Sequence, residues 1–295
     1  MDILNKEELL KFFRDKSNRF LNEIIKETSD YKKQANKINK MIQRLRDELL
    51  GIVLEKNLSK SKQLDHILLI NYVTNVVMLE YRNKVWNYDY MAFSRRIGEI
   101  WEPFCKLPFY YPVNNLSIYE PPKFEDVKNN LKIEIQEYID KLKITNDEKK
   151  ELINYFKSAW ALVESGGIKL ELDLHFIQNN THYDIDYKSG FSSNEKGNTN
   201  RLLLVASIYN TLPNKHKNMM FVRQAEEDNN HYLQTLKNSP YWDVYCADEA
   251  YKKIEQFTGF SLRKWMDENM NWHQDINAEF RDYLARNDLL KYLTW

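Results

Sequence analysis

Glycine and proline, the two residues that most readily interrupt helices, are scarce and unevenly placed in this chain. The sequence has 295 residues but only seven glycines and seven prolines, and long stretches carry neither. Five prolines fall within residues 103–122, and four glycines fall in one later window, at Gly166, Gly167, Gly190 and Gly197. This distribution predicts a helix-rich protein with one region in which the backbone turns sharply.

Apolar residues recur at helical spacing over most of the chain outside that region. In residues 2–28, for example, the apolar positions at this spacing are Leu9, Phe12, Phe13, Phe20, Leu21 and Ile24. Either Thr145 or Asn146 is expected to cap the helix that follows it. We expect a loop at residues 107–122 and helices at about residues 2–28, 31–46, 62–83, 89–105, 124–142, 146–164, 200–211, 229–238 and 248–257.

The apolar period changes to two after Gly166. Apolar residues from Ile168 to Phe176 alternate with polar ones, and after a turn at Gln178-Asn179-Asn180 the alternation resumes as far as Lys188. This pattern predicts a β-hairpin with one apolar face and one charged face. Short apolar strands are also expected at residues 219–222 and 242–246. The predicted fold class is therefore α/β, or helix-rich α+β, with a small mixed sheet flanked by helices.

The composition limits the classes of partner and the cellular location. The 43 basic and 43 acidic residues give no net charge, so any surface for nucleic acid must be local. The two cysteines, Cys105 and Cys246, lack metal-ligand spacing, which argues against disulfide scaffolds and zinc fingers. No secretory signal and no apolar stretch long enough to cross a bilayer is visible. We therefore expect a cytoplasmic protein without a membrane partner.

Three residues of the predicted hairpin form a candidate catalytic group. Asp173 and Asp186 are separated by twelve residues, so a hairpin would bring both to one end of neighbouring strands, with Lys188 beside them. Two close carboxylates repel one another unless a divalent cation lies between them, and oxygen ligands suit Mg²⁺. A lysine beside that ion can orient or deprotonate a water, which predicts metal-assisted phosphodiester hydrolysis. Glu171 and Asp184 are expected either to support this group or to be exposed.

These residues carry a resemblance to a known family. The segment ELDLHFIQNNTHYDIDYKSGF resembles the active-site motif of the PD-(D/E)xK nuclease superfamily, specifically of its type II restriction endonucleases. The first aspartate of that motif falls on Asp173, and the (D/E)xK element falls on Asp186-Tyr187-Lys188. Leu172 stands where the motif has a proline. The order of elements over residues 146–250 is similar to the core of that fold, and we expect an N-terminal helical region at residues 1–85 and a nuclease core with C-terminal helices at residues 86–295.

The resemblance implies a sequence-specific, Mg²⁺-dependent endonuclease that cuts double-stranded DNA and leaves 5′-phosphate and 3′-hydroxyl ends. Asp173 and Asp186 would hold the metal, and Lys188 would position the attacking water. Many members add a glutamate from a preceding helix, and here either Glu164 or Glu102 fits that role. A symmetric DNA site is most simply cut by a two-fold dimer, so a homodimer is expected.

The polar segment after the motif is the expected DNA contact, because it combines basic and amide side chains. Its candidate residues are Ser192, Ser193, Asn194, Lys196, Asn198, Asn200 and Arg201. The basic helix at residues 31–46 is a second candidate surface, or an ordinary solvent-exposed helix face. Two other functions fit the sequence: a repair, recombination or nicking nuclease with the same core, and a non-catalytic, helix-rich DNA- or protein-binding module.

Overall fold

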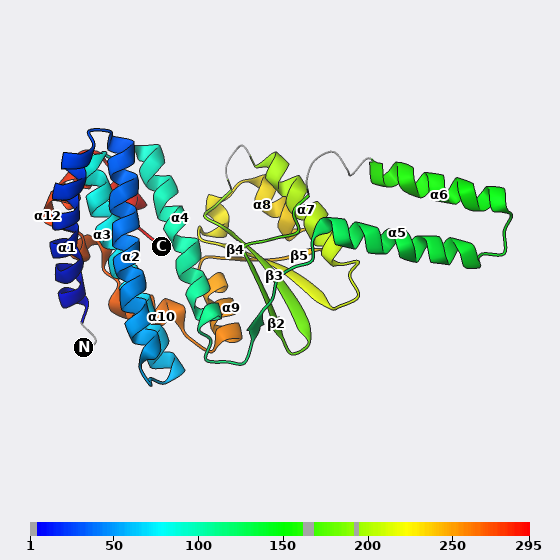
Figure 1. Ribbon diagram of the computed structural model, residues 1–295, viewed down its shortest axis with the longest axis horizontal. Helices are drawn as coiled ribbons and strands as arrows, with labels where there is room; N and C mark the ends of the chain where they lie inside the picture. Colours follow the sequence, from blue (N-terminus) through cyan, green and yellow to red (C-terminus); the bar gives the residue numbers. More distant parts are fainter. Residues whose placement is uncertain (1–4, 162–167, 192–194) are drawn as a thin grey trace.

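A five-stranded mixed β-sheet occupies the middle of the computed structural model, which describes residues 5–161, 168–191 and 195–295 (Figure 1). Its strands are β1 (Ser117–Ile118), β2 (Leu174–Gln178), β3 (Thr181–Lys188), β4 (His216–Val222) and β5 (Trp242–Cys246). The helices of these ranges are α1 (Lys6–Glu27), α2 (Tyr31–Glu55), α3 (Lys60–Val85), α4 (Tyr90–Tyr110), α5 (Phe124–Lys141), α6 (Asn146–Ala161), α7 (Lys196–Tyr209), α8 (His231–Lys237), α9 (Asp248–Thr258), α10 (Leu262–Asn269), α11 (Trp272–Asp275) and α12 (Ala278–Arg286), with single turns η1 (Glu226–Asp228) and η2 (Leu290–Tyr292). The expected fold class, a helix-rich α/β protein with a small mixed sheet flanked by helices, is confirmed.

The sheet runs in chain order from β1 to β5 and combines two kinds of pairing. β1 pairs with β2 and β2 pairs with β3 in antiparallel orientation, whereas β4 is parallel to β3 and β5 is parallel to β4. The two parallel connections pass through α7 and α8, whose apolar residues pack with β4 and β5. α4 and α9 pack against the opposite face, next to Phe176, Tyr187 and Phe221. Helices therefore cover both faces of the sheet.

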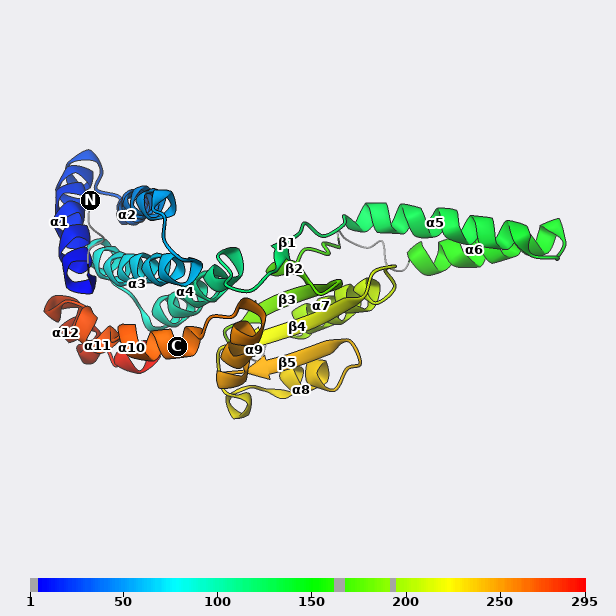
Figure 2. The ribbon, with the colours of Figure 1, turned by 90° about the horizontal axis from the view of Figure 1, so that it is seen from below.

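α1 to α4 and α10 to α12 lie together at one end of the molecule (Figure 2). Buried polar contacts join these segments: the Arg14 guanidinium lies 2.6 Å from Glu80, which also accepts a hydrogen bond from the Asn277 amide at 2.7 Å. The Tyr72 hydroxyl donates to Asp275 at 2.7 Å. The C-terminal helices thus pack on the N-terminal helical region in space, while the division of the chain at residues 85 and 86 stays a prediction.

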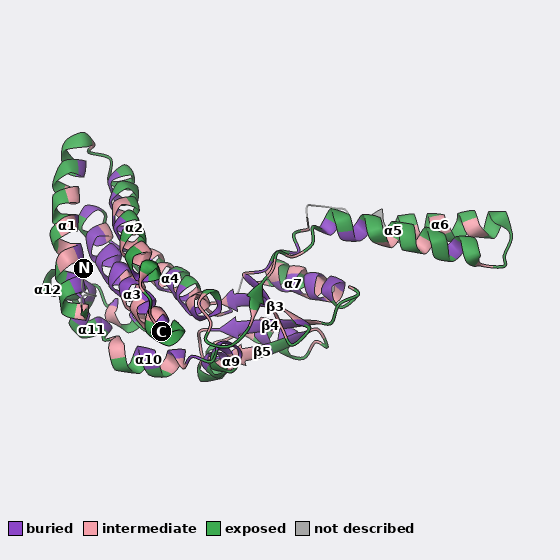
Figure 3. Ribbon diagram, turned by 60° about the horizontal axis from the view of Figure 1, so that its bottom comes forward, coloured by how far each residue is buried: buried purple, intermediate pink, exposed green. Residues whose placement is uncertain are grey.

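α5 and α6 form a helical hairpin that projects from the opposite end of the sheet (Figure 1). Figure 3 shows that this hairpin is mostly exposed, whereas burial concentrates in α3 and the sheet. Thr145 is the cap of α6, since its hydroxyl accepts a hydrogen bond from the Glu148 amide at 3.3 Å and its own amide donates to the Glu148 carboxylate at 2.8 Å. Among the described residues, no helix is long and apolar enough to cross a membrane.

The expected loop at residues 107–122 is only partly correct. α4 continues to Tyr110 with Pro103 and Pro108 inside it, because Pro108 and Phe109 are buried in the core and this packing offsets the interruption. The short strand β1 lies inside the same predicted loop and pairs with β2.

The expected first strand of the hairpin is also shorter than its alternation suggested. The turn at Asn179 and Asn180 is confirmed, with φ of 51° and 57°, but β2 begins only at Leu174. The chain bends at Asp173, whose Oδ2 accepts a hydrogen bond from the Tyr187 amide at 2.7 Å. The Leu172 amide donates to His175 Nε2 at 2.9 Å. Two side chains therefore satisfy backbone groups that a longer strand would have paired.

The charged face of the hairpin is largely buried, and of the two alternatives for Asp184, support of the group or exposure, exposure is wrong. Asp184 and Asp186 are 0% and 2% exposed, because α7 packs over this face. Glu171, in contrast, is exposed. The hairpin therefore places carboxylates in the interior, where each needs specific compensation.

Candidate active site at the end of the hairpin

Asp173, Asp186 and Lys188 come together where β2 begins and β3 ends. The antiparallel register pairs Leu174 with Ile185, so Asp173 and Asp186 are the next residues along the two strands. Asp186 and Lys188 share one face of β3, and the Lys188 ammonium lies 2.9 Å from Asp186 Oδ2. The hairpin thus brings together the three residues that the sequence singled out.

Asp186 is a buried carboxylate with incomplete compensation. Its Oδ2 has no partner that meets hydrogen-bond geometry among the described residues, although Lys188 is close. Burial raises the pKa of Asp186 to about 6; the charge of Lys188 opposes this shift and that of Asp173 adds to it. Asp186 is therefore an acid whose ionised form the surrounding protein stabilises poorly.

The first turns of α7 add a positive side chain and a helix terminus to this site. Arg201 Nη2 lies 3.9 Å from Asp186 Oδ1, and the Arg201 side chain is 40% exposed. Asn198 contacts the Arg201 guanidinium at 3.4 Å and donates to Glu195 at 3.1 Å. Glu195, at the N-cap position, makes no side-chain capping bond, and the first amides of a helix have no partner within the helix itself.

The remaining predicted DNA contacts divide into two groups. Lys196 and Asn200 are exposed on the same turns of α7 as Arg201, while Asn198 is half-buried. Ser192, Ser193 and Asn194 lie outside the described residues. In the described part of the predicted segment, Arg201 is therefore the residue that lies beside Asp186.

The structure leaves the third acidic residue of the site open. Glu164 lies outside the described residues. Glu102 lies 2.5 Å from Lys106 on α4, and the Lys106 ammonium lies 5.7 Å from the ring of Tyr187, which packs on the side of the sheet opposite Asp186. Over residues 5–161, 168–191 and 195–295, no three acids, histidines or cysteines gather at metal-binding distances. Two aspartates are therefore the described candidates for metal ligands.

A second buried carboxylate, Asp184, is the centre of a network that the sequence did not reveal. Asp184 accepts hydrogen bonds from His175 Nδ1 at 2.8 Å, from His216 Nδ1 at 2.7 Å and from the Tyr119 hydroxyl. Burial acts to raise the pKa of Asp184, but these three hydrogen bonds outweigh it and hold the pKa below its ordinary value. The one indication in the sequence was that Asp184 lies two residues before Asp186 and therefore on the same face of the strand. Its partners Tyr119 and His216 come from distant segments and could not be predicted.

Comparisons of the chain with protein-family models, with curated proteins and with solved structures found no match. The assignment of a function to this site therefore depends on its residues and their geometry.

Proposed function

We propose that this chain is a sequence-specific, Mg²⁺-dependent endonuclease of the type II restriction class, which hydrolyses phosphodiester bonds in double-stranded DNA to leave 5′-phosphate and 3′-hydroxyl ends. The observation that carries the proposal is the meeting of Asp173, Asp186 and Lys188 at one end of the hairpin. This end is also the carboxyl end of β3, which is parallel to β4, and ligands of open α/β sheets bind outside such strand ends.

The donor set suits a magnesium ion. Mg²⁺ usually takes one or two carboxylates and completes its shell with waters and substrate phosphate, so the two aspartates are sufficient. Among the described residues, no group makes a hydrogen bond of good geometry to the buried Asp186 Oδ2, and burial raises the pKa of Asp186 to about 6 despite the nearby Lys188. A divalent cation beside this carboxylate would therefore add compensation that Lys188 alone does not give. When bound, the ion would lower the pKa of a coordinated water and polarise the phosphoryl oxygen.

The protein groups around the aspartates have separate tasks in this proposal. Lys188 would hold the attacking water and offset negative charge that develops on the phosphate. Arg201 and the amide donors at the start of α7 would bind a DNA phosphate, because a helix N-terminus attracts anions. Lys196, Asn198 and Asn200 would extend this contact along the DNA.

The proposed partner is double-stranded DNA, and the proposed assembly is a homodimer in the cytoplasm. A two-fold dimer presents one catalytic group to each strand of a symmetric site. The neutral chain, with 43 basic and 43 acidic residues, would use local charge at α7 for DNA attraction.

Digestion of a plasmid of known sequence tests the class of enzyme. The purified protein is incubated with supercoiled plasmid in Mg²⁺ or in EDTA, and the ends of all fragments are sequenced. We expect discrete fragments in Mg²⁺ only, with one sequence at every end. Nicked circles alone would favour the nicking or repair nuclease, and a smear of fragments would indicate a general nuclease. Intact plasmid would favour a non-catalytic module. Any of these results would overturn the proposal.

A further inference from the structure

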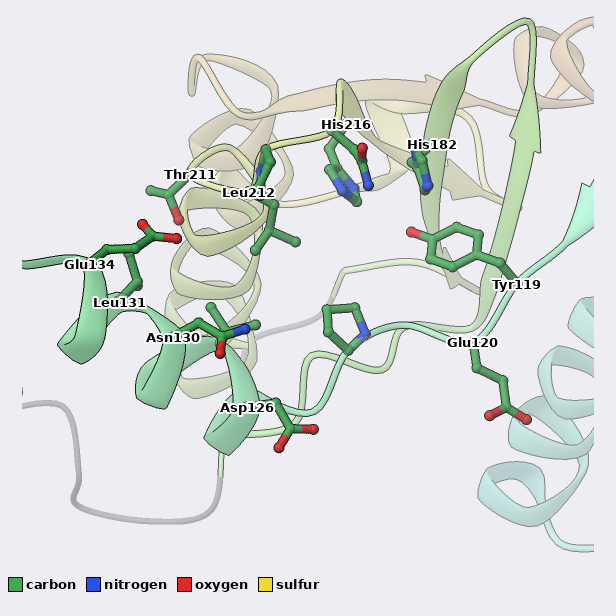
Figure 4. A pocket seen from close by; sticks show the side chains of 14 residues that line it. Tyr119, Glu120, Asp126, Asn130, Leu131, Glu134, His182, Thr211, Leu212 and His216 are labelled. Atoms are coloured by element: carbon green, nitrogen blue, oxygen red, sulfur yellow. The ribbon is translucent and has the colours of Figure 1, made fainter.

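A cavity of about 410 Å³ opens at the far end of the sheet from Asp186, where β3 and β4 begin (Figure 4). Its walls come from four segments: the chain before α5, one side of α5, the loop between α7 and β4, and the first residues of β3 and β4. The proposed nuclease chemistry uses none of the residues that line it.

His216 lies in the wall of this cavity and is held from behind by a buried carboxylate. His175 accepts a hydrogen bond from the Leu172 amide at Nε2, so its Nδ1 carries the proton that it donates to Asp184. His216 approaches the same carboxylate through Nδ1, at 2.7 Å.

His182 stands beside His216 in the cavity wall, with ring centroids 4.9 Å apart. Its Nδ1 is buried and has no hydrogen-bond partner among the described residues. Burial lowers the pKa of His182, and positive charge on the nearby His216 lowers it further. At neutral pH His182 is therefore a neutral imidazole that can accept a hydrogen bond.

The rest of the wall favours a positively charged ligand with an apolar body. The lining includes three exposed carboxylates, Glu120, Asp126 and Glu134, and neither a lysine nor an arginine. Leu212 lies beside His216 in the wall, and Leu131 lies beside Glu134 on α5 (Figure 4). Negative groups, apolar side chains and the nitrogen acceptor of His182 match an ammonium group on an aliphatic chain.

We propose that this cavity binds an organic cation of the alkyl diamine or polyamine class. One ammonium group donates a hydrogen bond to the imidazole of His182, the methylene chain packs on Leu131 and Leu212, and the second ammonium group meets the carboxylates of Asp126 and Glu134. A metal ion fits the cavity less well, because the described residues supply no group of three ligands.

Titration of the DNA-free, Mg²⁺-free protein with 1,4-diaminobutane, followed by calorimetry, tests this inference. Glu134→Gln removes a carboxylate from the cavity, and Glu137→Gln removes an exposed carboxylate from the same helix outside it. We expect Glu134→Gln to weaken binding about three- to fivefold, and Asp126→Asn with Glu134→Gln about tenfold or more, whereas Glu137→Gln binds as wild type does. No binding to the wild type, or equal losses in the two single variants, would overturn the inference.

The pH dependence of the same titration separates the cavity from general attraction to surface acids. The groups that face the ligand are Tyr119, Glu120, Asp126, Glu134, His182 and His216, with Asp184 behind the histidines. Protonation of His182 would replace an acceptor by positive charge while the carboxylates stay ionised. We expect binding to be lost between about pH 7 and pH 5. Binding that persists until the carboxylates protonate would place the diamine on the surface instead.

Discussion

Asp184 and Asp186 lie two residues apart on one face of β3, yet their environments act in opposite directions. Three hydrogen-bond donors surround Asp184 and hold its pKa below the ordinary value. Burial raises the pKa of Asp186 to about 6, because one ion pair with Lys188 does not replace the lost hydration. The network at Asp184 therefore stabilises the ionised carboxylate, whereas the ionised form of Asp186 is stabilised poorly.

Asp186→Asn should stabilise the protein in the absence of metal. The folded state binds the Asp186 proton more tightly than the unfolded chain does, so wild-type stability falls as pH rises from about 4 to 6 and stays reduced above that range. We expect the variant to gain about 1–3 kcal/mol at pH 8 and nothing near pH 4. Urea denaturation at both pH values measures this, with Asp243→Asn, an exposed acid on β5, as control. A variant less stable than wild type at pH 8 would contradict this view of Asp186.

Asp184→Asn should have the opposite effect. An amide accepts through one oxygen only, so its nitrogen would face a donor from Tyr119, His175 or His216. We expect a loss of about 2–4 kcal/mol in the free energy of unfolding. The same urea denaturation series measures this loss. If the free energy of unfolding changes by less than it does in Asp243→Asn, in either direction, the network contributes nothing to stability.

At the scale of elements, the spacing of apolar residues located most helices and strands, because each of these segments buries one face. Alternation placed β5 correctly, and the turn at Asn179 and Asn180 was visible in the residue types. The start of β2 was not visible in the sequence. The side chains of Asp173 and His175 accept hydrogen bonds from backbone amides that would pair within the sheet if the strand were as long as the alternation predicts. The site residues on the hairpin could be found from spacing alone, whereas Tyr119 and His216 needed the fold.

The hairpin turn should depend on the tolerance of asparagine for left-handed backbone. Asn180 has a φ of 57°, which a β-branched residue adopts only with strain. We expect Asn180→Val to cost about 1–2 kcal/mol of stability, and Asn180→Gly to be neutral or slightly stabilising. Thermal unfolding of both variants compares them. Equal melting temperatures for the valine and glycine variants would show that the left-handed backbone of the turn does not contribute to the stability of the hairpin.

The start of α7 should bind DNA phosphate through Arg201. Arg201→Ala should weaken DNA binding and reduce the slope of log affinity against log salt by about one unit. Lys215→Ala provides the control, because Lys215 is exposed just before β4, at the other end of the sheet. Fluorescence anisotropy in EDTA over a series of salt concentrations gives both slopes. If Arg201→Ala and Lys215→Ala behaved alike, DNA would bind elsewhere.

At the scale of the whole molecule, two chemically different candidate sites lie at opposite ends of the same sheet. The carboxyl ends of β3 and β4 carry the aspartates, Lys188 and the start of α7, while the opposite ends carry the histidine-lined cavity beside α5. The helical layer of α1 to α4 with α10 to α12 packs on the sheet through α4 and α9. The packing of the C-terminal helices on the N-terminal ones was not predictable, because it depends on pairs such as Arg14 with Glu80 and Tyr72 with Asp275.

The central proposal is that Asp173, Asp186 and Lys188 form a metal-dependent phosphodiesterase site. The most direct measurement compares plasmid cleavage in Mg²⁺ by wild type, Asp186→Asn, Lys188→Ala and the control Asp243→Asn, with circular dichroism to verify folding. We expect cleavage by wild type and Asp243→Asn, and a loss of at least about a hundredfold in the other two despite intact spectra. Folded Asp186→Asn or Lys188→Ala protein that cuts at the wild-type rate would contradict the proposal.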